Sequence, residues 1–140
     1  MANESSNVAP APTARLRVGI DIVSVSRIRE SIEQFGERFL SRIFTPAEIA
    51  YAVSSPGCRD ERLAARFAAK EAAMKALQLA NAGIPWSDFE VAREQSGECS
   101  LNLRGAAQRA VSGQGTYELA LSLSHEGDYA TAVVMAQRST

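Results

Sequence analysis

The chain has 140 residues, of which 46% are hydrophobic and 22% are charged, and its net charge is -1. These values are typical of a globular protein, and they argue against a strongly basic nucleic-acid-binding protein and against an acidic disordered one. No apolar stretch reaches the length of a membrane span, and the first residues lack the basic and apolar segments of a secretory signal. We therefore expect a cytoplasmic protein that binds neither nucleic acid nor membrane.

Residues 1–14 are rich in Ala, Pro, Ser and Asn without periodicity, which is typical of a disordered tail. Residues 15–140 are expected to form one domain. Cys58 and Cys99 do not have the spacing of a metal site, and His125 is the only histidine. A zinc site built from cysteine and histidine is therefore not expected.

The first expected element is a strand from Leu16 to about Asp21, where apolar and β-branched residues dominate. A helix should follow, because four apolar residues recur at helical spacing and predict one buried stripe: Ile28, Ile32, Phe35 and Phe39. Residues 45–48 then have the signals of a new helix start, with Thr45 as N-cap, proline in the first turn and Glu48 in a capping box. Residues 54–57 end that helix.

The Ala-rich segment from residue 60 to about residue 80 predicts the longest helix. Residues 89–93 and 99–104 should form two strands, followed by a short helix over residues 105–112. Residues 117–124 alternate in polarity as a strand with one buried face, and residues 129–135 should return as a strand after a turn at 125–128. The pattern predicts an α+β domain, with a mainly antiparallel sheet packed against a long central helix.

The central helix carries an unusual group of charges. On a helix, Arg66 and Lys70 lie one turn apart, and so do Glu71 and Lys75. The pattern is compatible with a solvated face that carries ion pairs. It is also compatible with a metal–phosphate site, because Mg²⁺ binds one or two carboxylates and accepts phosphate oxygens in its other positions.

Two further polar positions could belong to such a site. Asp21 interrupts an apolar strand, so it is either a turn residue or a second carboxylate that faces Glu71. His125 ends a strand in which Ser122 and Ser124 share one face. These three residues are either structural or able to hydrogen-bond a phosphate.

Taken together, these segments resemble the holo-acyl-carrier-protein synthases, the short 4′-phosphopantetheinyl transferases. Gly19-Ile20-Asp21-Ile22, followed by Arg27-Ile28, is similar to the first motif of that family. Residues 44–48 resemble the segment after its first helix, and residues 66–72 resemble its central Lys-Glu-Ala signature. Residues 122–133 resemble its C-terminal strand–turn–strand motif. The motifs occur in order from about residue 17 to residue 136.

The resemblance implies the 4′-phosphopantetheinyl transferase fold and an Mg²⁺-dependent reaction. In this reaction the 4′-phosphopantetheine arm of coenzyme A moves to a serine of an apo acyl carrier protein, and adenosine 3′,5′-bisphosphate is released. The short members of the family are commonly homotrimers with active sites between subunits. The same quaternary structure is therefore expected here.

The resemblance also implies roles for individual residues. Asp21 and Glu71 would hold Mg²⁺, while Lys70 and Lys75 would contact phosphate oxygens. Arg66, Phe67, Ser124 and His125 would bind the nucleotide end of coenzyme A. The proton acceptor for the serine could be Glu71, His125 or a water held by the metal, so the expected catalytic residues are Glu71, Lys75 and His125. The expected carrier-docking residues are Arg27, Arg29, Arg38 and Arg42.

The chain departs from the family after the central helix, where residues 77–84 replace a Gly-Thr-Gly-like loop. One alternative is therefore a relative that binds a carrier protein or coenzyme A without turnover. Another is a transferase dedicated to a secondary-metabolism carrier. An RNA-binding module is disfavoured, because no adjacent strands are expected to expose aromatic residues for stacking.

Overall fold

The computed structural model describes residues 15–139, so the tail expected at residues 1–14 lies outside the described residues. The elements follow the order β1 (Leu16–Ser24), α1 (Val25–Phe35), α2 (Glu37–Ile43), α3 (Pro46–Val53), α4 (Arg59–Ala76), the 3₁₀ turn η2 (Trp86–Asp88), β2 (Phe89–Arg93), β3 (Cys99–Leu103), α5 (Gly105–Ser112), β4 (Tyr117–Glu126) and β5 (Tyr129–Arg138). This arrangement confirms the expected α+β class. No helix within residues 15–139 is long and apolar enough to cross a bilayer.

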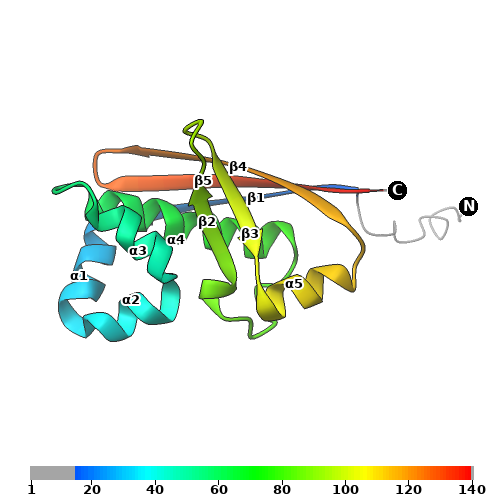
Figure 1. Cartoon of the computed structure of the whole chain (residues 1–140), viewed down its shortest axis with the longest axis horizontal. Coiled ribbons are helices and arrows are strands. Elements are labelled where there is room, and N and C mark those ends of the chain that lie inside the picture. The colour runs from blue at the N-terminus through cyan, green and yellow to red at the C-terminus, as the bar shows by residue number, and fades with distance from the viewer. Residues whose placement is uncertain (1–14, 140) are drawn as a thin grey trace, which may run out of the picture.

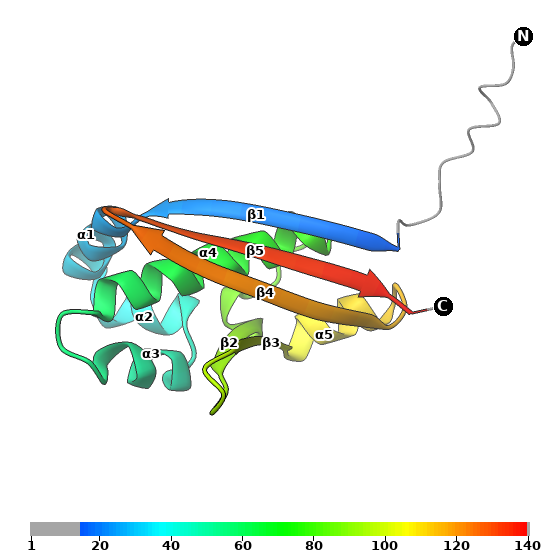
Figure 2. The same cartoon turned by 90° about the horizontal axis from the view of Figure 1, so that it is seen from above.

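The main sheet has three antiparallel strands in the order β1-β5-β4, and β2 pairs with β3 in a separate hairpin. Figure 1 shows the main sheet edge-on, with the helices on one side of it. Figure 2 shows the opposite face of the sheet, with α4 behind β1 and β5. The long central helix therefore packs on the inner face of the sheet, as the sequence predicts.

Gly19 brings α4 into close contact with the sheet. Its position in β1 faces the helix backbone, where an added Cβ would overlap the carbonyl oxygen of Ala72 and lie 2.8 Å from the nitrogen of Ala76. The helix presents small, fully buried residues to the strands, including Ala69 and Ala72. Glycine at position 19 of the strand and alanines on the helix permit this close approach, so β1 and α4 are held in a fixed relation.

Two expectations about the first helical segment are wrong. The expected continuous helix is divided into α1 and α2 at Gly36, which has a φ of 60°. Because the chain turns there, Phe35 does not continue the buried stripe formed by Ile28 and Ile32, and its side chain is 55% exposed. Phe39 lies on α2, partly buried against the core.

Several element ends also differ from the sequence expectations. β1 continues three residues beyond Asp21, because its pairing with β5 extends to Ser24 opposite Tyr129. β4 continues through His125 to Glu126, so His125 lies in a paired strand opposite Ala130 and not in the turn. The central helix ends at Ala76, before residue 80, because Gln78 adopts a left-handed backbone conformation.

A buried ion pair joins three of these elements. Thr45 and Glu48 form the expected capping box at the start of α3. The Glu48 carboxylate also accepts hydrogen bonds from Lys70 Nζ at 2.8 and 3.0 Å and from the Val91 amide at 2.8 Å. Lys70 Nζ donates a further bond of 2.6 Å to the Phe89 carbonyl. Both charged side chains are completely buried, so the pair fixes α3 and β2 against α4.

We expect Lys70→Met to lower the free energy of unfolding by about 3 to 5 kcal/mol, because it leaves the Glu48 carboxylate buried without its counter-ion. Urea denaturation would measure the change. The control is Lys75→Met on the same helix, where the side chain is 52% exposed and the expected loss is below about 1 kcal/mol. Equal losses in the two variants would contradict the assigned role of the buried pair.

Candidate active site

Asp21 and Glu71 come together where β1 crosses α4. Asp21 lies two residues after Gly19 in β1, so both positions face the inner side of the sheet. The Asp21 side chain is 17% exposed. Lys75 lies one turn beyond Glu71 on α4. Its Nζ donates hydrogen bonds of 2.9 Å to the Ile20 carbonyl and 3.2 Å to Asp21 Oδ1.

The environment raises the pKa of Glu71. Partial burial is the main cause, and the Asp21 carboxylate raises the pKa further, whereas the Lys75 ammonium lowers it. Two carboxylates that repel each other beside one lysine are a suitable donor set for a hard divalent cation, because the cation would remove the repulsion. No group of three or more His, Cys, Asp or Glu side chains suited to a metal is found within residues 15–139. The pair therefore fits Mg²⁺ if waters and substrate oxygens complete its coordination shell.

A second group of polar residues forms a cationic cavity, which we call the arginine pocket. The ring of Tyr51 has three guanidinium groups around it, with Arg62 at 4.1 Å, Arg66 at 4.5 Å and Arg93 at 5.5 Å from its centroid. The cavity has a volume of about 390 Å³, and Ser124 and His125 of β4 also line it. Such a cluster of fixed cations is suited to a phosphate group.

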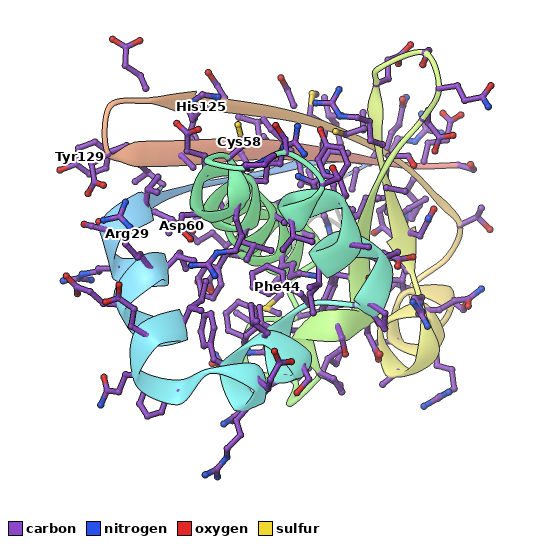
Figure 3. The ribbon with its side chains drawn as sticks, turned by 60° about the vertical axis from the view of Figure 1, so that its left-hand side comes forward. Arg29, Phe44, Cys58, Asp60, His125 and Tyr129 are labelled. Carbon is purple, nitrogen blue, oxygen red and sulfur yellow. The ribbon has the colours of Figure 1, made fainter. Side chains whose placement is uncertain are left out.

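Arg66 is only 3% exposed, and desolvation lowers the pKa of its guanidinium. Among the described residues its Nε finds no hydrogen-bond acceptor, which leaves a buried donor available. At the rim, His125 Nδ1 lies 3.5 Å from Glu61 Oε2. Figure 3 shows His125 on β4 above the start of α4, where Cys58 also lies. The arginine pocket is therefore positively charged and incompletely satisfied in the isolated chain.

The carboxylate pair and the arginine pocket do not share one side of the molecule. Five residues separate Arg66 from Glu71, which is a rotation of about 140° around a helix. The pair lies against β1, the pocket lies against β4, and these strands form opposite edges of the sheet. A single chain thus carries two polar clusters on opposite sides of α4, which we call half-sites.

The structure overturns one expected contact and relocates another. Lys70 cannot reach a phosphate at the surface, because its ammonium is fully buried against Glu48. Phe67 does not line the arginine pocket beside Arg66. Its ring stacks on Trp86, with centroids 4.8 Å apart, and it lies closer in rotation to Glu71 than to the pocket. The burial of Lys70 depends on a glutamate 22 residues away, so helical spacing alone could not reveal it.

Three lining residues that give the pocket its aromatic and cationic character are not among those expected from the sequence: Tyr51, Arg62 and Arg93. Arg62 precedes Arg66 by one helical turn, and this spacing was a usable signal. Tyr51 and Arg93 join the pocket only through packing of α3 and β2 against α4. No local pattern could therefore have identified them.

The four arginines proposed for carrier docking are all exposed, but they occur on two helices. Arg27 and Arg29 lie on α1, and Arg38 and Arg42 lie on α2. Arg29 is already engaged, since its Nε lies 2.9 Å from Asp60 Oδ2, and Figure 3 shows the two side chains pointing toward each other. That ion pair raises the pKa of Arg29 through hydrogen bonding to Asp60. The remaining three arginines form the available cationic surface.

The chain is similar to known proteins over most of its length. It is 50% identical over 123 residues to the holo-[acyl-carrier-protein] synthase of Koribacter versatilis, covering 87% of this chain and 98% of that protein. It is 44% identical to the protein of the same name from Moorella thermoacetica, covering 89% and 95% of the two chains.

Solved structures give the same result. An ACPS–CoA complex named as from Chronobacterium ammoniagenes matches with a TM-score of 0.80 at 32% identity, covering 91% of this chain and 100% of that one. The Helicobacter pylori holo-[acyl-carrier-protein] synthase in complex with coenzyme A matches with a TM-score of 0.74 at 29% identity, covering 86% and 99%. The sequence profile of the 4′-phosphopantetheinyl transferase superfamily matches residues 17–134. The chain therefore belongs to the 4′-phosphopantetheinyl transferase superfamily.

Proposed function

We propose that this protein is a holo-acyl-carrier-protein synthase that acts in the cytoplasm. It transfers the 4′-phosphopantetheine arm of coenzyme A to a serine of an apo acyl carrier protein and releases adenosine 3′,5′-bisphosphate. The single observation that carries this proposal is the convergence of Asp21, Glu71 and Lys75 at the contact of β1 and α4. Family membership and the relatives named as holo-[acyl-carrier-protein] synthases support it.

In the proposed reaction, the serine oxygen forms a bond to the phosphorus that carries pantetheine. The bond from that phosphorus to the adenosine 3′,5′-bisphosphate oxygen breaks, and the serine proton passes to a nearby acceptor. Asp21 and Glu71 would hold Mg²⁺, which supplies charge neutralisation at the diphosphate when bound. Lys75 is positioned to donate a hydrogen bond to a phosphate oxygen, because its ammonium is half-exposed beside Asp21.

The arginine pocket completes the recognition of coenzyme A in this proposal. Arg62, Arg66 and Arg93 provide charge for the phosphate at the nucleotide end, and Ser124 and His125 border the same cavity. Because the pocket and the carboxylate pair lie on opposite sides of α4, one coenzyme molecule would not contact both half-sites of one chain. We propose a homotrimer in which the half-sites of neighbouring subunits face each other.

The outer face of the sheet supports the assembly. Strand β1 exposes a row of four large apolar side chains on that face, each between 57% and 65% exposed: Leu16, Val18, Ile20 and Ile22. The cross-strand register places Met135 beside Val18, which continues the apolar surface onto β5. A contiguous patch of this kind is unusual on a monomer, and a second copy of the chain would bury it.

The first test uses Glu71→Gln. We expect at least about a hundredfold loss of transfer, because the variant removes the charge of one of the two carboxylates proposed to hold the metal at the reacting phosphate. Intact-mass spectrometry of an apo carrier protein, incubated with coenzyme A and Mg²⁺, would report the gain of about 340 Da that accompanies transfer. EDTA should abolish the gain in the wild-type reaction.

The matched control is Glu98→Gln in the β2–β3 turn, which is exposed and should leave transfer unchanged. Undiminished transfer by Glu71→Gln would disprove the metal-ligand role. A wild-type protein that binds coenzyme A but modifies no carrier would instead support the binding protein without turnover. Transfer only to a secondary-metabolism carrier would identify a dedicated transferase.

A complementation experiment tests the shared site. Asp21→Asn disables the carboxylate half-site. His125→Asp places a negative charge in the arginine pocket, where it would pair with the arginines and repel the phosphate of coenzyme A. Each variant alone should therefore be inactive. Co-expression should restore about one quarter of wild-type activity, because a shared site requires an intact half from each of two randomly chosen subunits. If each site lies within one chain, no subunit in the mixture is intact, and activity will not return.

Carrier docking predicts a dependence on salt. Replacing Arg27, Arg38 and Arg42 by alanine should lower kcat/KM for the carrier protein about tenfold at low salt and much less at high salt, since exposed charges act mainly on encounter. The KM for coenzyme A should not change. Arg109→Ala on α5 removes an exposed arginine elsewhere and is the control. An unaltered kcat/KM for the carrier protein at low salt in the triple variant would exclude this docking surface.

A further inference from the structure

Gln78 has an unusual backbone conformation. It is the one non-glycine residue within residues 15–139 that has a positive φ, at 58°. It follows the end of α4, where the Leu79 amide donates 2.8 Å to the Met74 carbonyl and the Gln78 amide donates 3.2 Å to the Lys75 carbonyl. Helices that end in this way strongly favour glycine at the left-handed position, so a glutamine there is conformationally unfavourable.

The left-handed turn brings the Gln78 side chain to a cavity of about 490 Å³, which Met74, Lys75 and Asn81 also line. Lys75 joins this cavity to the carboxylate pair, because its Nζ contacts Asp21. Gln78 lies two residues beyond the end of α4, so it reaches this cavity through the turn that follows the helix. The cavity is therefore connected to the carboxylate pair through Lys75.

We propose that the side-chain amide of Gln78 hydrogen-bonds the pantetheine arm of coenzyme A and so contributes to substrate specificity. This inference rests on the proposed function. The diphosphate of coenzyme A joins the nucleotide to the pantetheine arm. If Asp21 and Glu71 hold the diphosphate and the arginine pocket binds the nucleotide, the arm leaves the carboxylate pair in another direction.

The chemistry of the cavity matches the arm. Pantetheine is uncharged and carries amide and hydroxyl groups, which both accept and donate hydrogen bonds. Gln78 and Asn81 offer neutral carboxamides with the same dual capacity. An unfavourable backbone conformation at a site of this kind is expected where the side chain serves the ligand, because helix stability alone would favour glycine.

The test compares Gln78→Ala, which retains the left-handed β-carbon, with Gln78→Gly, which removes it. Calorimetric titration would use two probes, coenzyme A and 3′-phosphoadenosine 5′-diphosphate, which keeps the diphosphate and lacks only the pantetheine arm. Both variants should bind coenzyme A about fivefold more weakly and bind 3′-phosphoadenosine 5′-diphosphate as the wild type does. Gln78→Gly should also raise the thermal midpoint, because glycine adopts this conformation without strain.

A higher thermal midpoint together with a lower affinity for coenzyme A in Gln78→Gly would show that the side chain contacts the ligand and does not serve to end the helix. A Gln78→Gly variant that is more stable and keeps wild-type affinity for coenzyme A would overturn the proposal. Equal weakening of both probes would also overturn it, because the contact would then not involve the arm. Gln108→Ala on α5 is the control and should alter neither titration. Failure of the wild-type protein to modify any carrier would overturn the proposed function, whereas these titrations judge Gln78 separately.

Discussion

The close contact of α4 with β1 is the constraint on which the candidate site depends. Gly19 lies against the helix backbone, and the helix meets the sheet through alanines that are fully buried. Because side chains of this size leave no room for adjustment, the rotation of α4 about its axis is fixed. That rotation places Glu71 and Lys75 next to Asp21, and it directs Arg62 and Arg66 to the other side. This packing contact thus determines the position of the carboxylate pair and the side of α4 on which Arg62 and Arg66 lie.

The position of the two half-sites on opposite sides of α4 suggests a role in assembly for the exposed face of the sheet. If one chain held the whole site, the apolar row on β1 would only reduce its solubility. In the proposed homotrimer, burial of Val18, Ile20 and Ile22 would stabilise the assembly, and the pocket of one copy would face the carboxylates of another. Assembly and activity would then be coupled, because a separated subunit would lack a complete site.

The sequence was sufficient for much of this arrangement. The spacing on the Ala-rich segment pairs Glu71 with Lys75, whereas Asp21 alone could equally be a turn residue, and only the family resemblance joins the three in one site. Lys70 shares that spacing, but its burial depends on Glu48 of α3, a tertiary contact that no local pattern encodes. Tyr51 and Arg93 were missed for the same reason. The division of the first helix at Gly36 was missed because the apolar period continues across the break.

Each half-site carries a charge that is unfavourable in the isolated chain. The charge is negative at the carboxylate pair and positive in the arginine pocket. Burial and Asp21 raise the pKa of Glu71, so its negative charge is disfavoured, while desolvation lowers the pKa of Arg66, so its positive charge is disfavoured. A divalent cation relieves the first cost, and a phosphate group relieves the second. Since a metal–coenzyme complex supplies both charges, its binding should stabilise the native state more than its surface contacts alone would. In the proposed reaction, the metal–coenzyme complex would therefore gain affinity from the relief of both costs.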